Sequence, residues 1–554
     1  MLFAQRLRMC ARAGSCALVA LGAACGNAHD PSRDHTLVVA LAAEPTLLLP
    51  PLIAETPGFV VADQILERLA EPDSTLDIAG DRAFHPRLAD RWAWAPDSLS
   101  IAFHIAPNAR WHDGRPVTAH DVRFTFAIYT DTAVASPAAS LLTNIDSVEV
   151  RDDRVAVFWF RRRHAHQFFD ATYHMRILPK HVLGAAPPGS LRSSAFARAP
   201  TGSGPFRFAR WVPGQFVELA ANDAFREGRA RFDRIVFTIA TDPSAALART
   251  IAGDIDIMPD LAAADASLAA RATSLRLVRW PSLSSGLVML DLHDPVHRDR
   301  PHPVLDDPSV RQALAMAIDR ARLTTAALGD GAEPAKGPLP AALLPDTSQL
   351  LPPFDPDAAA ALLESHGWRL PHGSRVRHRG TTPLELALLV SISGAAAQRA
   401  AVVMQDQLSR IGARLEIEPV DNATLATRLA SHRFDAALIA LDWDPNPLSA
   451  RQLWGSPGDA SEQSSNFGGY RSEAFDAAMN AASFALDSTD ARLAATRAWR
   501  TLVHDAPAIW LYDFRRVAAI RDCIRPAAVR ADSWWSSLAA WSVSHRCPTR
   551  PGRS

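Results

Sequence analysis

Strands and helices alternate along residues 384–441, and this alternation constrains the fold more than any other feature of the chain. The strand-like run LELALLVS precedes AAAQRAAVVMQDQLSRIG, a helical pattern that Gly412 ends. A strand (RLEIEPV), a helix (NATLATRLASH) and a strand (FDAALIAL) follow. Such alternation predicts an α/β fold, a parallel sheet covered by helices. Open sheets of this kind bind ligands beyond the carboxyl ends of their strands, so the residues after Leu441 are predicted to contact a ligand.

The first half of the chain has a different rhythm. Residues 37–41 form an apolar run typical of a buried strand, and LSIAFHI alternates as a half-buried strand does. VEVRDDRVAVFWF predicts two strands around a turn at Asp152 and Asp153. DPSAALARTIAG predicts a helix with Asp242 as N-cap and Gly253 as its stop. This part is predicted to be hairpin-rich and antiparallel before the α/β region begins.

Length and composition restrict the class of protein. The 554 residues exceed one ordinary core and indicate two to four units. The hydrophobic and charged fractions, 48% and 21%, are those of a globular protein. A formal net charge of −1 argues against a nucleic-acid surface, which needs a basic excess. After the N-terminal region no segment reaches transmembrane length.

The N-terminus has the pattern of a secretory signal peptide, which we place at residues 1–24. Arg6, Arg8 and Arg12 precede a short apolar run with small residues, and Cys25 follows at once. The run resembles a bacterial lipobox, which predicts lipidation of Cys25 and a membrane anchor. Gly22 stands where the lipobox has a large apolar residue, so cleavage without lipid is the alternative. The polar residues 25–35 are predicted to be a tether.

The cysteine count agrees with export. Cys10 and Cys16 leave with the signal peptide, and Cys25 carries the lipid. Cys523 and Cys547 remain as an even pair in an oxidising compartment, which predicts a disulfide between them. Two unpaired thiols are the alternative.

The run RWHDGRPVTAHDVRFTF contains two His-Asp pairs and raises the question of an HD-type metallohydrolase. Such an enzyme needs several His and Asp ligands to converge on a metal. Asp113 and the residues after it have the composition of a turn, and Thr118 with Asp121 fits a capping box at a helix start. Asp121 then has a local structural role, so we predict that these pairs, His112 with Asp113 and His120 with Asp121, build structure and bind no metal.

A long stretch around this run carries a family resemblance. HPRLADRWAWAPDSLSIAFHIAPNARWHDGRPVTAHDVRFTFAIY resembles the signature of the family 5 extracellular solute-binding proteins, the peptide-binding components of ABC importers. PTGSGPFRF, DDPSVRQALAMAIDRARL, DWDPNP and SSNFGGYRSEAFDAAM are similar to further runs of that family. In the second of these, Asp307 is expected to cap a helix with a buried stripe of Val310, Leu314, Ile318 and Ala321. The resemblance covers about residues 36–530.

The resemblance implies a periplasmic-binding-protein-like fold, with two lobes, a hinged cleft and an extra subdomain inserted in the larger lobe. We place lobe I at residues 36–65, 198–288 and 512–547. The inserted subdomain is expected at 66–197 and lobe II at 289–511.

The resemblance also implies site residues. An acidic residue of the DWDPNP run, Asp442 ahead of Asp444, is expected to take the free amine of a peptide, unless it only caps the turn. Trp443 is a candidate cleft wall or core residue, and Arg399 a candidate for a ligand carboxylate or a solvated helix residue. Gly202 and Gly204, in the TGSGP turn, are expected near the cleft or hinge, with backbone freedom as their reason.

The function implied is that of a non-enzymatic, monomeric binding protein without cofactor, in the periplasm or cell envelope. It captures peptides by closing its lobes and delivers them to a membrane permease. One alternative is the same fold with other cargo, such as a metal chelate, sugar, haem or opine. The other is the exported HD-type metallohydrolase, which the lack of other catalytic motifs disfavours.

Overall fold

One large mixed sheet runs through the molecule. The computed structural model describes residues 35–262, 265–344, 349–456, 465–485 and 487–544. The strand order of this sheet is β17-β16-β18-β12-β19-β11-β1-β10-β9-β8, with β13 paired to β19. In that order the strands span Arg414–Val420, Glu385–Ser391, Ala436–Asp442, Leu275–Leu290, Ala508–Arg521, Ile257–Met258, Thr36–Leu41, Arg234–Ile239, Phe216–Ala221 and Phe206–Val212, and β13 spans Ala332–Pro334.

The predicted α/β region forms one end of this sheet. Strands β16, β17 and β18 are parallel, as the alternation predicted, and α10 (Ala395–Ser409) and α11 (Asn422–Ala430) connect them. Helix α10 ends before Gly412, whose φ of +78° only glycine adopts easily. The α/β fold class is therefore confirmed.

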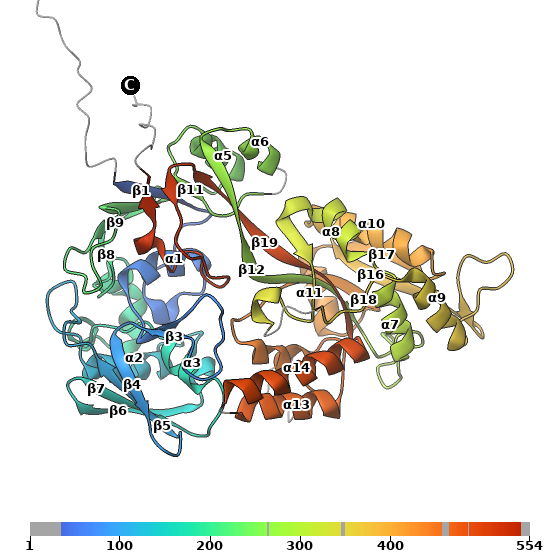
Figure 1. The fold of residues 1–554 in the computed structure, drawn as a ribbon, viewed down its shortest axis with the longest axis horizontal. Helices are drawn as coiled ribbons and strands as arrows, with labels where there is room; N and C mark the ends of the chain where they lie inside the picture. The colour runs from blue at the N-terminus through green and yellow to red at the C-terminus, as the bar shows by residue number, and fades with distance from the viewer. Residues whose placement is uncertain (1–34, 263–264, 345–348, 457–464, 486, 545–554) are drawn as a thin grey trace, which may run out of the picture.

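Two long strands join the two lobes. β12 and β19 pair antiparallel along most of their length, and only the C-terminal half of β12, Ser284–Leu290, pairs with β18. The other end of β19 pairs with β11 and so reaches the strands of lobe I. A register shift lies between Pro281 and Ser285, where the pairing of β12 with β18 begins. Figure 1 shows these two strands as the bridge between the halves of the molecule.

Lobe I contains the antiparallel region that the sequence predicted. Strand β1 is buried as predicted, but it departs from the antiparallel pattern because it lies parallel to β10 and β11. A separate four-stranded antiparallel sheet has the order β4-β5-β7-β6, with bounds Ala89–Trp94, Ser100–Ile105, Val155–Phe160 and Ile145–Asp152. Short pairs are β2 (Ala70–Pro72) with β3 (Phe84–Pro86) and β20 (Ile524–Arg525) with β21 (Ser542–Val543). A third short pair, β14 (His378–Arg379) with β15 (Thr382–Pro383), lies in the second half of the chain.

Helices cover both lobes. Before β12 these are α1 (Thr56–Ile65), α2 (Ala119–Thr130), α3 (Gln167–Thr172), α4 (Lys180–Leu183), α5 (Pro243–Ile251) and α6 (Ala266–Ala270). After β12 they include α7 (Pro308–Met316), α8 (Arg320–Leu328), α9 (Pro356–Ser365), α12 (Arg451–Trp454), α13 (Glu473–Phe484) and α14 (Ser488–Asp505).

Several helix starts follow the predicted capping chemistry. The Asp242 carboxylate accepts from the Ala245 N–H at 2.6 Å, which confirms it as the N-cap of α5. Asp307 caps α7 by accepting from the Ser309 N–H at 2.9 Å. Local polar residues thus place these helix ends before any tertiary packing is considered.

The helix expected after Asp307 is two helices. Asp319 accepts from the Arg322 N–H at 2.9 Å and so caps α8, which breaks the helix after Met316. The predicted stripe is buried only as far as Ile318, and Ala321 is exposed. The expectation of one continuous helix was wrong because a second N-cap residue lies inside its apolar pattern.

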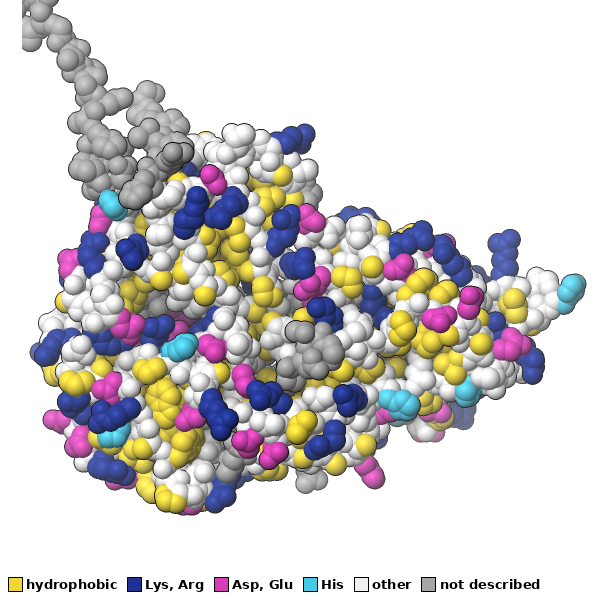
Figure 2. Space-filling model, viewed as in Figure 1, with side chains coloured by type: hydrophobic (Ala, Val, Ile, Leu, Met, Phe, Trp, Pro, Cys, Tyr) yellow, Lys and Arg dark blue, Asp and Glu magenta, His cyan; other side chains and the backbone are white. Residues whose placement is uncertain are grey.

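The surface and the termini bear on the remaining expectations. Charges of both signs are interspersed over the face seen in Figure 2, in keeping with the net charge of −1. None of the helices in the described ranges is long and apolar enough to cross a membrane. The predicted signal peptide, most of the tether with Cys25, and Cys547 lie outside the described residues, so those predictions stay open. Cys523 is buried.

Candidate ligand-binding site

Strand β18 ends at Asp442, and the chain then turns through residues 443–446 into a short 3-10 helix, η9 (Pro447–Ala450). The turn is built by side chains of its own. Asp444 accepts from the Asn446 N–H at 2.8 Å, and Asn446 in turn accepts from the Leu448 N–H at 2.9 Å. These local bonds fix the backbone at the carboxyl end of the sheet, where ligands of α/β proteins bind.

Asp444 is a half-buried carboxylate that no cationic side chain of the described residues pairs with. Burial raises the pKa of Asp444 to about 6, against the opposing effect of the Asn446 N–H, and the negative Asp170 and Asp532 raise it further. Asp170 lies in α3 of lobe I, and Asp532 follows β20. Asp444 is therefore within electrostatic reach of two other acids, and no cationic side chain in the described ranges neutralises it.

The neighbours of Asp444 already have partners. Asp170 is 2.9 Å from Nε2 of His164, and Asp532 receives hydrogen bonds from the Arg530 guanidinium at 2.9 Å and the Tyr173 hydroxyl at 2.8 Å. Of the three carboxylates, Asp444 is the one with a free capacity to bind a cationic group. The electrostatic field at this position favours a positive charge.

Asp442, the preferred anchor at the level of the sequence, has a different setting. It is exposed at the end of β18, and the Ser284 hydroxyl of β12 donates to its carboxylate. Asp442 thus links β18 to the neighbouring strand β12 through this hydrogen bond. Its exposure makes it the weaker candidate, because a charge pair in bulk water contributes little.

Trp443 and Arg399 both have partners inside lobe II. The Trp443 indole donates to the Ser285 hydroxyl at 2.8 Å, and the side chain is 7% exposed within the hydrophobic core of that lobe. Of the two interpretations offered for Trp443, the structure supports the core. Arg399 donates from Nε and Nη2 to the carbonyl of Ala327 at 3.2 and 2.7 Å, near the end of α8. This guanidinium caps a helix end and is exposed to solvent.

The turn with Gly202 and Gly204 lies against the end of α1. A Cβ on Gly202 would come within 1.8 Å of the Ile65 carbonyl oxygen, and one on Gly204 within 2.8 Å of the same atom. Neither glycine has a positive φ. The reason for glycine here is therefore close backbone approach, not the backbone freedom that the sequence suggested.

His112 holds the same turn from its other side. The Gly202 N–H donates to Nδ1 of His112 at 3.1 Å, and Nε2 donates to the Gly204 carbonyl at 3.0 Å. Burial lowers the pKa of His112 to about 4, although the Gly204 carbonyl opposes this effect. His112 is a neutral structural bridge, with both ring nitrogens in use.

The other members of the two His-Asp pairs also have separate structural roles. Asp113 pairs with His181 at 2.7 Å, and His120 lies 3.4 Å from Asp153. Asp121 accepts from the Thr118 N–H at 2.8 Å, which confirms the capping box at the start of α2. Among the described residues no group of three or more His, Cys, Asp or Glu side chains could hold a metal. The prediction that these pairs build structure agrees with this geometry.

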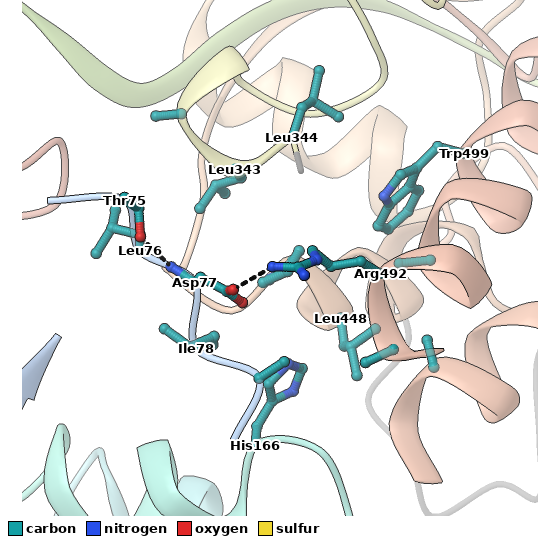
Figure 3. A pocket seen from close by; sticks show the side chains of 16 residues that line it. Thr75, Leu76, Asp77, Ile78, His166, Leu343, Leu344, Leu448, Arg492 and Trp499 are labelled. Atoms are coloured by element: carbon teal, nitrogen blue, oxygen red, sulfur yellow. Dashed lines mark hydrogen bonds and ion pairs between the residues drawn. The ribbon is translucent and has the colours of Figure 1, made fainter. Parts of the chain in front are cut away.

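A cavity of about 320 Å³ lies at the seam between the two lobes. The loop Thr75–Ala79 and His166 of lobe I form one wall, while η8 (Ala341–Leu343), η9, α13 and α14 of lobe II form the other. Figure 3 shows the Asp77 carboxylate and the Arg492 guanidinium meeting across it, at 2.6 Å. The sequence did not indicate this cavity, because its lining residues come from separate segments of the chain, and Asp77 and Arg492 are 415 residues apart.

The molecule has two lobes joined by the paired strands β12 and β19, with a cavity at their seam and an unpaired acid nearby. These features define the class of bilobal binding proteins. The chain belongs to the bacterial extracellular solute-binding proteins, family 5, whose sequence profile matches residues 83–462.

Relatives and solved structures agree with this membership. The chain is 26% identical over 421 residues to the oligopeptide-binding protein AppA of Bacillus subtilis, which covers 75% of each chain. The structure of AppA in complex with a nonapeptide matches with a TM-score of 0.67 at 24% identity, over 92% of this chain and 99% of that one. The ABC transporter substrate-binding protein CtaP of Listeria monocytogenes matches with a TM-score of 0.77 at 20% identity, over 92% and 99%. The overall fold is that of these proteins, and the chain is an extracellular solute-binding protein.

Proposed function

We propose that the protein captures peptides outside the cytoplasm and delivers them to the membrane permease of an ABC importer. The family supports this role, and the name of the relative AppA supports peptides as the solute. The mechanism is binding without covalent chemistry. The residue pattern that suggested a hydrolase has structural roles that account for all four side chains.

The observation that carries the proposal is the unpaired Asp444 at the carboxyl end of β18. A peptide's free ammonium group is the cation that this carboxylate lacks. A charge-assisted hydrogen bond in a partly closed site is stronger than the same bond in water. Asp170 on the other lobe adds negative potential at the same place. The ammonium group is therefore attracted from both lobes at once.

The edge of β18 supplies a second support for a peptide. Its parallel partner β16 pairs with it only at Ala436 and Ala437, whereas β12 pairs with it as far as Asp442. On the side of β18 that faces β16, residues 438–442 have no strand partner within the described ranges. An extended peptide that adds a strand there gains main-chain hydrogen bonds without selecting side chains, and this edge leads directly to Asp444.

Capture requires the lobes to close. We place the hinge in β12 and β19 near the lobe limits at residues 288/289 and 511/512, because both strands run from one lobe into the other there. A register shift between Gly286 and Leu287, opposite Tyr512 and Trp510, lies beside these limits. The limits given above for lobe I, the inserted subdomain and lobe II are part of this proposal. A ligand that touches both lobes favours the closed state by the difference in its affinity for the two states.

The protein is proposed to work as a monomer tethered to the cell envelope. A signal peptide of residues 1–24 directs export, and lipid on Cys25 anchors the chain through the tether of residues 25–35. Intact-mass measurement of the membrane fraction tests this step. A mature chain that starts at another residue and carries no lipid contradicts it.

A disulfide between Cys523 and Cys547 is proposed near the C-terminus. The Ser544 N–H donates to the Cys523 carbonyl at 2.8 Å, next to the β20–β21 pair, and Cys547 follows three residues later. A bond here closes a short loop and stabilises the fold by about 3 kcal/mol. Peptide mapping without reduction tests it, and two alkylated thiols in the exported protein contradict it.

The decisive experiment for the function is native mass spectrometry of the protein purified without refolding. Bound masses that correspond to peptides with a free amine support the proposal, particularly if the Asp444→Asn variant purifies without them. A metal chelate, sugar, haem or opine in their place would show that the fold carries other cargo.

A further inference from the structure

The seam cavity has a mostly apolar wall built by both lobes. The side chains that provide it are Leu76, Ile78, Leu343, Leu344, Leu448 and Ala495. Leu76 belongs to lobe I in sequence but packs within the hydrophobic core of lobe II. The cavity is therefore a gap left between two apolar surfaces that already meet around it.

The polar groups of the cavity leave it without net charge. Asp77 and Arg492 neutralise one another in their ion pair. Burial lowers the pKa of His166 to about 3, so its imidazole is neutral at physiological pH. A largely aliphatic cavity without net charge favours an apolar group over a charged one, whose desolvation it does not compensate.

One buried hydrogen-bond donor lies in the wall of the cavity. Trp499 is fully buried, and its Nε1–H has no acceptor among the described residues. Figure 3 shows the ring nitrogen on the side of the indole that faces the cavity. A buried donor without an acceptor costs about 1–3 kcal/mol, and neighbouring atoms shield this N–H from the free space of the cavity.

The cavity is complete only when the lobes are together. The Ala165 N–H of lobe I donates to the Ser483 carbonyl of α13 at 2.7 Å, and the Asp77–Arg492 pair crosses the same seam. Residues 447 and 448 line the cavity and follow Asp444 by three and four positions. A ligand held at Asp444 in the closed state therefore lies beside the cavity.

We propose that the seam cavity binds one large apolar side chain of the captured peptide, aliphatic or aromatic. This inference rests on the proposed peptide-binding function and adds a preference at one position of the peptide. An apolar protein cavity of about 150 Å³ holds a benzene molecule, so about 320 Å³ has room for a whole phenylalanine side chain.

The experiment measures the affinity of the full-length mature protein for synthetic alanine peptides of two to six residues with a free amine. Each host is compared with peptides in which a single Phe is placed at each position in turn. At one position the Phe peptide is expected to bind about tenfold or more tightly than its host, as burial of a Phe side chain predicts. At the other positions the change is small.

Two variants locate that preference. Ala495→Leu fills the cavity from α14, and Leu448→Ala removes one wall from the half-buried η9; both are expected to abolish most of the Phe gain but leave binding of the alanine host. Leu493→Phe, on the exposed face of α14, adds volume away from the cavity and keeps the gain. Leu448→Ala keeps the test decisive if Ala495→Leu does not fold.

The outcomes separate this inference from the function on which it rests. If the alanine hosts bind and no Phe position improves them, the cavity assignment is wrong and the peptide-binding function stands. If the Phe gain survives in both Ala495→Leu and Leu448→Ala, the side chain binds elsewhere and the assignment is also wrong. If no member of the series binds the unaltered protein, the proposed function fails and the inference fails with it.

Discussion

His112 donates from Nε2 to the carbonyl of Gly204, 92 residues away in the chain, at 3.0 Å. Its other ring nitrogen accepts from the Gly202 N–H, so the bridge needs the neutral imidazole with the proton on Nε2. Protonation would place a second N–H against the Gly202 N–H. This bridge connects the residue run that first suggested catalysis with the turn that first suggested a hinge.

The His112 bridge predicts that stability falls at mildly acidic pH. The pKa of His112 is lowered to about 4 in the folded protein from 6.5, so the unfolded chain binds more protons between these values. The free energy of unfolding is then full above pH 6.5 and decreases as the pH falls towards 4, by about 3 kcal/mol at most from this residue. Urea unfolding at pH 7 and pH 4.5 measures the loss. His112→Gln should lose less between the two pH values than the unaltered protein, and an equal loss contradicts the assignment.

The contact between Gly202 and Ile65 predicts that Gly202→Ala is severely destabilising. The added Cβ lies 1.8 Å from a backbone oxygen of α1, so main chain must move, at a cost of at least about 3 kcal/mol. Gly189→Ala is the matched control, because a Cβ there meets nothing closer than 3.7 Å and its change should stay within about 0.5 kcal/mol. Thermal unfolding of both variants gives the comparison. Similar melting temperatures for the two would mean that the turn can shift without loss.

The sequence predicted the local structure of this chain better than its site. Helix starts at Asp242, Asp307 and Thr118 were predictable because capping is a bond between a side chain and backbone two or three residues away. The parallel strands followed from the alternation of apolar runs for the same local reason.

The contacts of individual side chains with residues far away in the chain could not be predicted in the same way. Trp443 lies next to the proposed anchor in sequence, but its indole turns into the core to reach Ser285. The guanidinium of Arg399 goes to the carbonyl at the end of another helix. Leu76 and Trp499 both line the cavity, and a periodic pattern in the sequence cannot predict that residues so far apart in the chain lie together. Burial at the end of β18 is the reason that we propose Asp444 as the anchor and not Asp442, since Asp444 is half-buried and Asp442 is exposed.

Asp444 as the amine anchor predicts a large loss of affinity in Asp444→Asn. Removing one partner of a sheltered charge pair costs about 2–5 kcal/mol, which is a loss of about 30-fold or more. Asp406→Asn, an exposed change on α10, is the control for loss of charge. Asp442→Asn tests the other acid of the run, and a larger loss there than in Asp444→Asn would move the anchor to Asp442. Calorimetry with the peptide found in the purified protein provides these values.

The same carboxylate predicts a pH dependence of binding. The ammonium group of a peptide stays charged throughout the acidic range, so only the carboxylate form of Asp444 binds it well. Because the pKa of Asp444 is raised to about 6 in the ligand-free protein, affinity should fall as the pH drops below 6. Binding at pH 5.5 should release a proton, which titrations in two buffers of different ionisation enthalpy detect. Constant affinity between pH 7 and pH 5 argues against an anchor at this residue.

Asp444 also predicts a conflict between binding and stability. Its pKa is raised to about 6 in the folded state from 3.8, so the folded protein binds more protons between pH 4 and pH 6, and stability falls as the pH rises through this window. Above pH 6 the ionised, unpaired acid costs about 1–3 kcal/mol, with the lower values applying because the side chain is half-buried. Asp444→Asn should therefore raise the melting temperature of the ligand-free protein at pH 7.5 although it weakens binding. A lower melting temperature would mean that the carboxylate has a stabilising partner.

The ion pair between Asp77 and Arg492 is predicted to hold the two lobes together weakly, with a coupling energy that decreases with salt. The side chains are 29% and 42% exposed, so solvent screens their attraction and the coupling should be below about 1 kcal/mol. A double-mutant cycle of Asp77→Asn, Arg492→Gln and the combined variant, read by peptide affinity, measures it. The coupling should shrink between 20 mM and 500 mM salt, because the screening length falls from about 20 Å to about 4 Å over that range. A cycle with Arg82 and Asp487, which lie 4.0 Å apart across the same seam and are more exposed, should give a smaller value. Coupling of several kcal/mol at high salt would instead identify the Asp77–Arg492 pair as a main determinant of closure.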